Sequence, residues 1–365
     1  MLAKKYMGHY TNFISRFKRK VYFIYFSTVP FRFSTVAYHT KERFLSLLGV
    51  RHGFRIIDLA VTYDCNLKCE HCSALVMKNH LKRNLGLDDY REIVRQARQL
   101  HTLSWNVTGG EPLLVPWLED LIPILNPKIH YISIQTNCML LDRKRAQILA
   151  RLGVNCITTS LDSAEPVQHN NFRGSEYSYQ RVMEGVKAAR DAGMQVLIGG
   201  TVTHENLRSP GLIQLIEKVN RLGAIFLFNL AVPCGNWAGN ERIILHGEDR
   251  NYLLQLMKKY PKTTTDHEAG RNAIGCPAGV EKIYITPYGD VIPCPFIHIS
   301  FGSILNDSLQ KIISRMRKVE HFRSYQDICV AAEDINFQKK VMGSINSFAQ
   351  SCPVPYTKIY GELHE

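Results

Sequence analysis

Several common protein classes leave no pattern in this sequence. The basic N-terminal region lacks a run long enough to cross a membrane: the uncharged aromatic stretch 21–31 has eleven residues, whereas a spanning helix needs about 20. Arg32 ends that stretch and no small-residue cleavage site follows, so it does not fit a secretory signal peptide. No Ser-His-Asp arrangement, phosphate-binding loop or pair of acids stands out. Nothing therefore indicates hydrolytic or nucleotide-driven chemistry.

The composition is that of a soluble globular protein. Of its 365 residues, 45 % are hydrophobic and 21 % are charged, and the chain is long enough for one large or two ordinary domains. Its ten cysteines are clustered, without the short, loop-rich pattern of a disulfide-stabilised secreted protein. They indicate metal ligation in a reducing compartment, and the predicted location is cytoplasmic.

Positive charge is concentrated at the N-terminus. Residues 1–50 hold nine Lys and Arg side chains against one acid, Glu42, and so contribute +8 of the net charge of +13. Two interpretations of this extension, residues 1–54, stay open. In the first, residues 1–35 form a peripheral membrane contact with anionic lipid. In the second, the segment packs on the rest of the fold with its charges in water. No nucleic-acid-binding module is recognisable, so no nucleic acid partner is expected.

An alternation of strand-like and helix-like segments begins after residue 54. The strand-like runs are 55–63, 105–108, 130–135, 156–161, 195–202 and 225–232. Amphipathic helix-like stretches lie between them at 87–100, 142–152, 179–192 and 212–222. This rhythm predicts an α/β fold with a parallel sheet, closed as a partial barrel or open and doubly wound.

Chemistry-bearing residues follow each strand-like run. In a partial barrel and in an open, doubly wound sheet alike, ligands bind at the carboxyl ends of the strands. The six ends carry, in order, a cysteine triad, Gly109-Gly110-Glu111, Asn137, Asp162 after Ser160, His204, and Cys234. One polar or thiol motif directly after a strand-like run is weak evidence, but six of them predict a functional site at this edge of the sheet.

The cysteine triad is the most specific motif. Cys65, Cys69 and Cys72 have the spacing C-x3-C-x2-C, and three close thiolates suit a cubane cluster, in which they hold three irons and leave the fourth open. A tetrahedral zinc site would want a fourth Cys or His nearby, and the adjacent His71 would give a strained chelate. The alternatives are a zinc knuckle or buried thiols that pack as small hydrophobes.

These motifs resemble those of the radical S-adenosylmethionine (SAM) enzymes. The resemblance covers about residues 55–330 and implies a partial (β/α)6 TIM-like barrel with a [4Fe–4S] cluster, whose open iron binds S-adenosylmethionine. Reductive cleavage would then give a 5′-deoxyadenosyl radical. It also implies a reducing electron donor such as flavodoxin or ferredoxin.

The resemblance further implies a set of cofactor-binding residues. Gly109, Gly110 and Glu111 would bind the ammonium group of S-adenosylmethionine, and Ser160 and Asp162 its hydroxyl groups. Arg173 would pair with its carboxylate, and His71 would lie near the adenine. Asn137 and Thr201 are expected to point at the site, where they would contact cofactor or substrate.

A second set of cysteines lies near the C-terminus, at 276, 294, 329 and 352. Residues 282–286 and 291–292, joined across Gly289, predict a β-hairpin that would bring distant thiols together. This segment resembles the SPASM or twitch extensions of radical SAM enzymes, small α+β units with auxiliary iron–sulfur clusters. The chain lacks the full C-x2-C-x5-C-x3-C block, so the resemblance implies one auxiliary cluster.

By that match Cys276, Cys294 and Cys329 are the predicted ligands, with Cys352 as the fourth. Glu333, Asp334, His298 or the substrate itself stay open as replacements for Cys352, and a zinc site with the same four thiolates is the structural alternative. Among the other cysteines, Cys138 and Cys156 are expected to be buried thiols and Cys234 to face the substrate.

The predicted organisation is an extension at 1–54, a radical SAM barrel at 55–240 and an auxiliary-cluster domain at 241–365. The predicted function is hydrogen abstraction from an unknown substrate, followed by oxidation or bond formation. A sugar or alcohol dehydrogenase and a maturase of ribosomally made peptides are the enzymatic alternatives. A non-catalytic iron–sulfur or zinc-binding protein is the alternative from another class, and a loop suited to binding an ammonium group argues against it.

Overall fold

The computed structural model describes residues 33–47, 54–265, 275–348 and 352–363. Within them, one curved sheet has the strand order β7-β6-β5-β4-β3-β2-β1-β8-β9. Neighbouring strands run parallel, except that β8 and β9 are antiparallel. The strands are β1 Ile56–Thr62, β2 Ser104–Gly109, β3 Tyr131–Gln135, β4 Cys156–Ser160, β5 Gln195–Val202, β6 Ile225–Leu230, β7 Thr263–Thr265, β8 Lys282–Ile285 and β9 Val291–Ile292.

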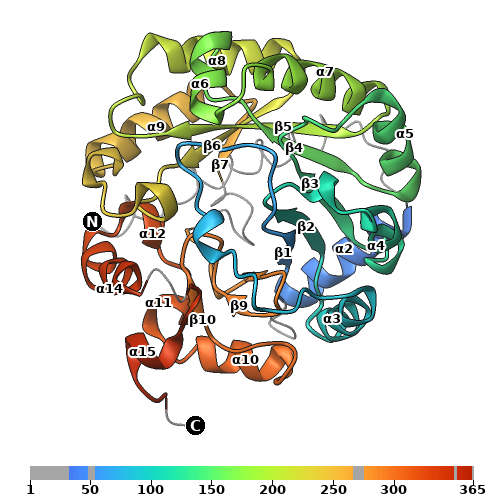
Figure 1. Cartoon of the computed structure of the whole chain (residues 1–365), viewed down its shortest axis with the longest axis vertical. Helices are drawn as coiled ribbons and strands as arrows, with labels where there is room; N and C mark the ends of the chain where they lie inside the picture. The colour runs from blue at the N-terminus through green and yellow to red at the C-terminus, as the bar shows by residue number, and fades with distance from the viewer. Residues whose placement is uncertain (1–32, 48–53, 266–274, 349–351, 364–365) are drawn as a thin grey trace, which may run out of the picture.

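Helices cover the outer side of this sheet (Figure 1). They are α3 Leu87–Gln99, α4 Leu118–Ile124, α5 Arg143–Leu152, α6 Pro166–Arg173, α7 Ser178–Asp191, α8 Pro210–Arg221 and α9 Gly247–Lys259, and a further helix, α2 Phe33–Leu47, lies at the ends of the strands. Helix α5 shows how the sequence sets such bounds: the Asp142 side chain caps its first turn, and Gly153, with φ of 106°, ends it. The predicted partial barrel is confirmed.

The C-terminal extension consists of short elements around the end of the β8–β9 hairpin. Its helices are α10 Leu309–Met316, α11 Glu320–Arg323, α12 Val330–Glu333, α13 Ile335–Phe337, α14 Gly343–Ser347 and α15 Tyr356–Tyr360. Strands β10 Ile299–Ser300 and β11 Val354–Pro355 pair in parallel as a second, small sheet. Single turns occur at Leu75–Met77, Pro112–Leu114, Gly235–Trp237, Glu241–Ile243 and Gln338–Met342.

The two faces of the main sheet differ in chemistry. One face is apolar and lies under the helices, with Trp105, Ile134 and Phe226 fully buried. Because side chains alternate along a strand, the neighbouring residues point to the other, inner face. Over β1 to β4 hydrogen bonds link polar side chains of adjacent strands across this face, namely Asn106 to Asp58, Thr108 to Gln135 and Ser133 with Thr158. The barrel interior is therefore polar over these strands, whereas β6 adds the apolar Ile225 and Leu227.

The predicted hairpin forms and joins the barrel sheet directly. Strand β8 pairs with β1 in parallel, and the Lys282 ammonium lies 3.1 Å from the Asp58 carboxylate on the inner face. Strands β7, β8 and β9 all follow residue 240, so the sheet continues beyond the boundary predicted between barrel and extension. The division of the chain into domains stays a prediction.

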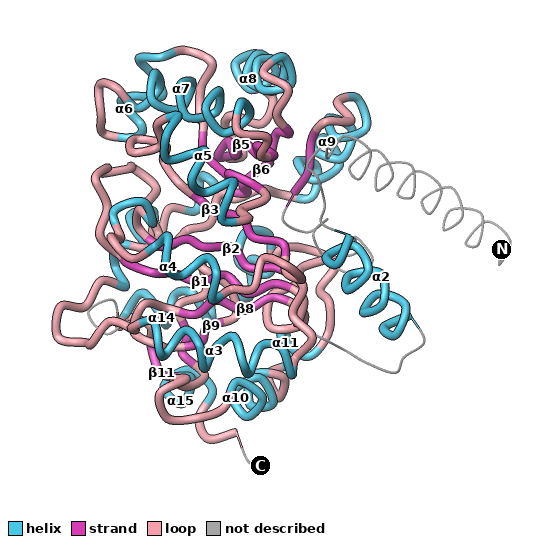
Figure 2. The backbone as a smooth tube through the Cα atoms, turned by 90° about the vertical axis from the view of Figure 1, so that its right-hand side faces the viewer, coloured by secondary structure: helices cyan, strands magenta, loops and turns pink. Residues whose placement is uncertain are grey.

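Helix α2 packs at the amino ends of strands β2 and β3 (Figure 2). The Tyr38 hydroxyl donates to the Thr102 carbonyl, and the Ser34 hydroxyl donates to the Lys128 carbonyl. Residues 33–47 thus behave as the packed arm that was one of the two interpretations. The basic and aromatic residues 4–32, which motivated the lipid-binding interpretation, lie outside the described residues. None of the helices in the described part of the chain is long and apolar enough to cross a membrane.

A steric test follows from the contact between β5 and β6. A Cβ atom added at Gly200 would lie 2.7 Å from the Phe226 ring and 3.2 Å from the Leu161 carbonyl oxygen. Gly200→Ala should lower the free energy of unfolding by about 1–3 kcal/mol, the usual range for overpacking. Gly247→Ala is the matched control, because a Cβ there meets open space.

Chemical denaturation under anaerobic conditions measures both variants. Combination with Phe226→Leu should reduce the cost of Gly200→Ala, because the ring that clashes is gone. Equal stabilities for Gly200→Ala and the wild type would contradict this packing.

Candidate functional site

The loop that carries Cys65, Cys69 and Cys72 follows β1 and crosses the middle of the curved sheet, drawn in light blue in Figure 1. Other loops hold its backbone in place. The Glu70 amide donates to the Phe172 carbonyl. Asn236 donates twice, from its amide to the Cys72 carbonyl at 3.0 Å and from its side chain to the Cys69 carbonyl at 3.1 Å. The three thiols are therefore presented by a fixed backbone at the carboxyl end of the sheet.

Gly109 and Gly110 allow the loop after β2 to pack against the chain that leads into the cysteines. A Cβ at Gly109 would lie 2.1 Å from the Thr62 carbonyl oxygen, and one at Gly110 would lie 2.2 Å from that of Asp64. The amides of Gly110 and Glu111 donate to the same two carbonyls, at 2.7 and 2.8 Å. These glycines thus set the position of the cysteine loop, and their predicted contact with the cofactor stays a prediction.

Glu111 is fully buried and already hydrogen-bonded. Its Oε1 accepts from the Thr136 hydroxyl at 2.7 Å and from the Leu113 amide at 2.9 Å, while Oε2 accepts from the Asn137 amide at 2.8 Å. Burial raises the pKa of this carboxyl group, and the hydrogen bonds counteract it. In this geometry Glu111 positions Asn137, whose side-chain amide donates to the Asn66 side chain at 2.7 Å and approaches the Cys65 sulfur at 3.8 Å.

Asp162 and Arg173, predicted to bind different parts of the cofactor, bind each other. The Arg173 Nε lies 2.7 Å from Asp162 Oδ2, and Asp162 Oδ1 accepts from the Thr201 hydroxyl at 3.0 Å. Burial pushes the pKa of Asp162 upward, but the Arg173 guanidinium outweighs it and holds that pKa well below its usual range. Arg173 Nη1 also lies 3.6 Å from the Cys69 sulfur, so this ion pair reaches the cysteine loop.

Ser160 and His71 are brought to the same edge. Ser160 is half-buried at the end of β4. The His71 ring stacks on Phe172, with ring centres 4.7 Å apart, and lies 5.6 Å from the Trp237 ring. Burial lowers the pKa of His71 to about 4, so the ring is neutral at physiological pH. The three rings form an apolar cover beside the cysteine loop.

Three thiols of the second set also converge. Cys276 pairs with the backbone of Gln326, through an amide hydrogen bond of 2.7 Å, and this brings it to Cys329. Their two thiols share a hydrogen bond, and this contact, with burial, raises the pKa of Cys329. Cys294, at the end of the hairpin, is close enough to both to influence them electrostatically, and burial raises the pKa of its thiol to about 12.

The donors of both groups are of the type that iron–sulfur clusters bind. Thiolates hold such clusters, and each group brings three of them to one part of the fold on backbones that other segments hold. Among the described residues no three His, Cys, Asp or Glu side chains gather as they would around one metal ion. The ligand sets of the two groups stay predictions.

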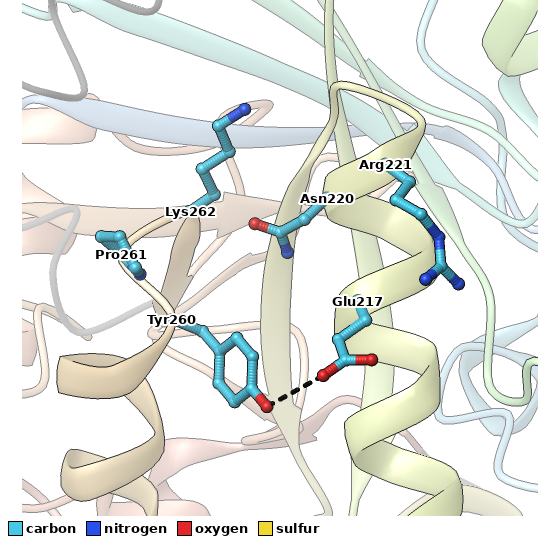
Figure 3. Close-up of a pocket in the computed structure, with 6 residues that line it drawn as sticks. All are labelled: Glu217, Asn220, Arg221, Tyr260, Pro261 and Lys262. Carbon is cyan, nitrogen blue, oxygen red and sulfur yellow. Dashed lines mark hydrogen bonds between the residues drawn. The ribbon is translucent and has the colours of Figure 1, made fainter.

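A separate hollow on the outside of the barrel has no such donors. It lies between α8 and the segment before β7, where the Tyr260 hydroxyl donates to Glu217 at 3.2 Å (Figure 3). The other lining residues are Asn220, Arg221, Pro261 and Lys262. None of these is a thiol or an imidazole, so the cysteine loop remains the candidate site.

The sequence marked the loop after β6 only by its place at a strand end. The hydrogen bonds by which Asn236 holds the cysteine loop, and the packing of the Trp237 ring beside His71, were not predicted. The Thr201 hydroxyl donates to Asp162, and its expected contact with cofactor or substrate stays a prediction.

The buried ion pair gives a stability prediction. Asp162→Asn should lower the free energy of unfolding at pH 7 by about 3–5 kcal/mol, because it leaves the Arg173 charge buried without its partner. Asp191→Asn is the matched control: Asp191 pairs with Lys187 at 2.7 Å on the surface, where an ion pair contributes at most about 1 kcal/mol.

The pKa of Asp162 determines how its contribution to stability changes with pH. The folded-state pKa of Asp162 is depressed, so its contribution is complete above the unfolded pKa of about 4 and decreases as the pH falls below it. Denaturation at pH 7 and at lower pH measures both variants. A cost for Asp162→Asn no larger than that for Asp191→Asn would contradict the buried pair.

Comparisons with known proteins agree with this site. Residues 59–216 match the Radical SAM superfamily, and residues 276–346 match SPASM, an iron–sulfur cluster-binding domain. The chain is 25 % identical to the AdoMet-dependent heme synthase of Nitratidesulfovibrio vulgaris over 302 residues, which are 74 % of this chain and 81 % of that protein. It is also 25 % identical to the subtilosin biosynthesis protein AlbA of Bacillus subtilis, over 70 % of this chain and 58 % of AlbA.

Solved structures show the same fold. Streptococcus suis SuiB, crystallised with its precursor peptide SuiA, superposes with a TM-score of 0.59 at 17 % identity, over 78 % of this chain and 69 % of SuiB. The enzyme anSMEcpe with bound AdoMet superposes with a TM-score of 0.56 at 17 % identity, over 79 % of this chain and 88 % of anSMEcpe. The protein is a radical SAM enzyme, a member of that superfamily with a C-terminal SPASM domain.

Proposed function

We propose that this enzyme oxidises an organic substrate by two electrons, starting with hydrogen-atom abstraction at a C–H bond. One observation carries the proposal: the two groups of thiols are built on neighbouring strands of one sheet. Strand β8, which lies between Cys276 and Cys294, pairs in parallel with β1, which leads into Cys65. A substrate radical formed beside the first cluster then has an electron acceptor close by.

The cofactors divide between the two groups. Cys65, Cys69 and Cys72 would hold three irons of a [4Fe–4S] cluster, and one auxiliary cluster would sit on the second group. With S-adenosylmethionine bound, the reduced first cluster would supply a 5′-deoxyadenosyl radical. The electrons would come from a reducing donor such as flavodoxin or ferredoxin, in a cytoplasmic setting.

The protein's own residues orient and shield this chemistry. Glu111 fixes the Asn137 backbone, and Asn137 in turn approaches the Cys65 sulfur. The Asp162–Arg173 pair places a guanidinium beside the Cys69 sulfur. The rings of His71, Phe172 and Trp237 cover one side of the cysteine loop, which is otherwise largely open to solvent.

Gly109, Gly110, Ser160 and Thr201 would complete the cofactor site. In this assignment the glycines bring backbone close to the cofactor, and Ser160 at the end of β4 offers a free hydroxyl. The polar inner face of the barrel, with Asn106, Thr108 and Gln135 half-buried, supports a substrate rich in hydrogen-bonding groups.

Residues 1–54 would form an arm on the barrel, residues 55–240 the radical SAM unit and residues 241–365 the auxiliary-cluster unit. Residues 1–35 would make a peripheral membrane contact.

Modification of a peptide is the second candidate. AlbA, named for biosynthesis of the bacteriocin subtilosin, matches nearly as much of this chain as the heme synthase does, and SuiB was solved with its precursor peptide. The polar barrel interior suits backbone amides as well as it suits the polar groups of a metabolite.

Cleavage of S-adenosylmethionine tests the reaction type. The reconstituted, chemically reduced wild type should form 5′-deoxyadenosine, and Cys65→Ala, Cys69→Ala and Cys72→Ala should each abolish it, because each loses one of three iron ligands. Cys156→Ala is the control, since that thiol is buried in β4 away from both groups. Cleavage retained in any of the three ligand variants would refute the assignment.

Deuterium transfer tests the substrate class. Extract from cells grown on deuterated medium is separated into peptides and small molecules, and each fraction is incubated with the enzyme. Hydrogen abstraction should place deuterium in 5′-deoxyadenosine with the small-molecule fraction. Deuterium only with the peptide fraction would support the second candidate, and none with either would contradict hydrogen abstraction.

A further inference from the structure

Helix α2 packs on the barrel by one face only. The residues of this inward face are Thr35, Tyr38, His39 and Glu42. Their spacing of three and four residues places them along one side of the helix. The Thr35 hydroxyl donates to the Lys128 carbonyl at 3.0 Å, and the His39 Nε2 lies 3.0 Å from the Leu103 carbonyl oxygen. These contacts hold α2 against the segments that lead into β2 and β3.

The opposite face of α2 is uncharged and exposed. Its residues are Val36, Ala37, Thr40 and Phe44. They fall within an arc of about 100° around the helix and form what we call the outer α2 stripe. Val36 is 44 % exposed and Phe44 is 60 % exposed, although both side chains are hydrophobic. Single exposed hydrophobic side chains are common on protein surfaces, but here two of them share one face of one helix.

The charge around the outer α2 stripe is positive. Lys41 is exposed beside it. The one acid of the helix, Glu42, is on the inward face, where its carboxylate lies 3.4 Å from the His101 Nδ1. The preceding residues 1–32 contain seven Lys and Arg side chains and no Asp or Glu. An apolar stripe among positive charges complements an anionic lipid surface.

The position of α2 determines what a bound surface would leave open. The helix bonds to the backbone just before β2 and just before β3, so it lies at the amino edge of the parallel sheet, and Figure 2 shows it at the margin of the molecule. The cysteine loop follows β1 and lies at the carboxyl edge. A surface that binds the stripe therefore approaches the edge opposite to the thiols.

We propose that the outer α2 stripe lies on an anionic lipid surface. The inference rests on the peripheral contact proposed for residues 1–35 and adds to it a folded helix that sets the orientation of the enzyme. Val36 and Phe44 would enter the apolar boundary below the headgroups, with Lys41 among the phosphates. The carboxyl edge of the sheet then faces water, so substrate and electron donor reach the cysteine loop from the aqueous side.

Vesicle binding by the full chain tests the proposal. Flotation compares vesicles of phosphatidylglycerol and phosphatidylcholine with vesicles of phosphatidylcholine alone. Val36→Glu and Phe44→Glu each place an acid in the stripe. Leu254→Glu is the matched control, because Leu254 on α9 is 51 % exposed and undergoes the same change in charge. Far-UV circular dichroism checks that each variant is folded.

We expect the wild type and Leu254→Glu to bind only the anionic vesicles. Each stripe variant should bind them at least about tenfold more weakly, because burial of one large apolar side chain contributes about that factor. Phe44→Ala, which removes the ring without adding charge, should also weaken binding. Formation of 5′-deoxyadenosine should be the same with and without vesicles, since the carboxyl edge stays open.

Equal binding by the stripe variants and Leu254→Glu would overturn the proposal and leave the membrane contact to residues 1–35 alone. A wild type that binds neither kind of vesicle would overturn the stripe and the contact of residues 1–35 together. Light scattering without lipid tests another occupant: a dimer that dissociates in Phe44→Glu would assign the stripe to a second copy of the chain and overturn the proposal. Loss of 5′-deoxyadenosine formation on adding anionic vesicles would contradict the orientation.

Discussion

The close approach of two backbone segments at the edge of the sheet is the constraint on which the site depends. The loop after β2 touches the chain that leads into the cysteines, with room for glycine alone at 109 and 110. Any side chain there would push the cysteine loop away from the sheet. The position of three thiols is thus set by main-chain hydrogen bonds rather than by their own side chains, and a cluster would add to this order rather than create it.

The two faces of the sheet around that contact have different roles, packing on the outer face and polar interactions on the inner face. The outer face of the sheet is apolar and supplies the packing with the helices, while the inner face carries polar side chains that pair across strands. Strand β8 continues this inner face into the SPASM region, where Lys282 pairs with Asp58. Barrel and extension therefore share one sheet, and the second group of thiols starts from the same rigid body as the first.

Much of the fold and the core of the site could be predicted from the sequence. The six strands between residues 55 and 232 follow from the alternation of strand-like and helix-like segments, and the cysteine triad from its spacing. What could not be predicted is which polar residues bind one another. Asp162 and Arg173 are eleven residues apart and were assigned to different parts of the cofactor, but burial favours their pairing. Glu111 was expected to face a ligand, yet three internal donors occupy its carboxylate.

The most direct test of the account is the iron content and EPR spectrum of the wild-type enzyme, purified and reduced anaerobically, with and without S-adenosylmethionine. The account predicts about eight irons per chain and two signals, of which one changes when S-adenosylmethionine binds and the other does not. About four irons and a single signal would contradict the two-cluster account, and no change on adding S-adenosylmethionine would contradict the assignment of Cys65, Cys69 and Cys72.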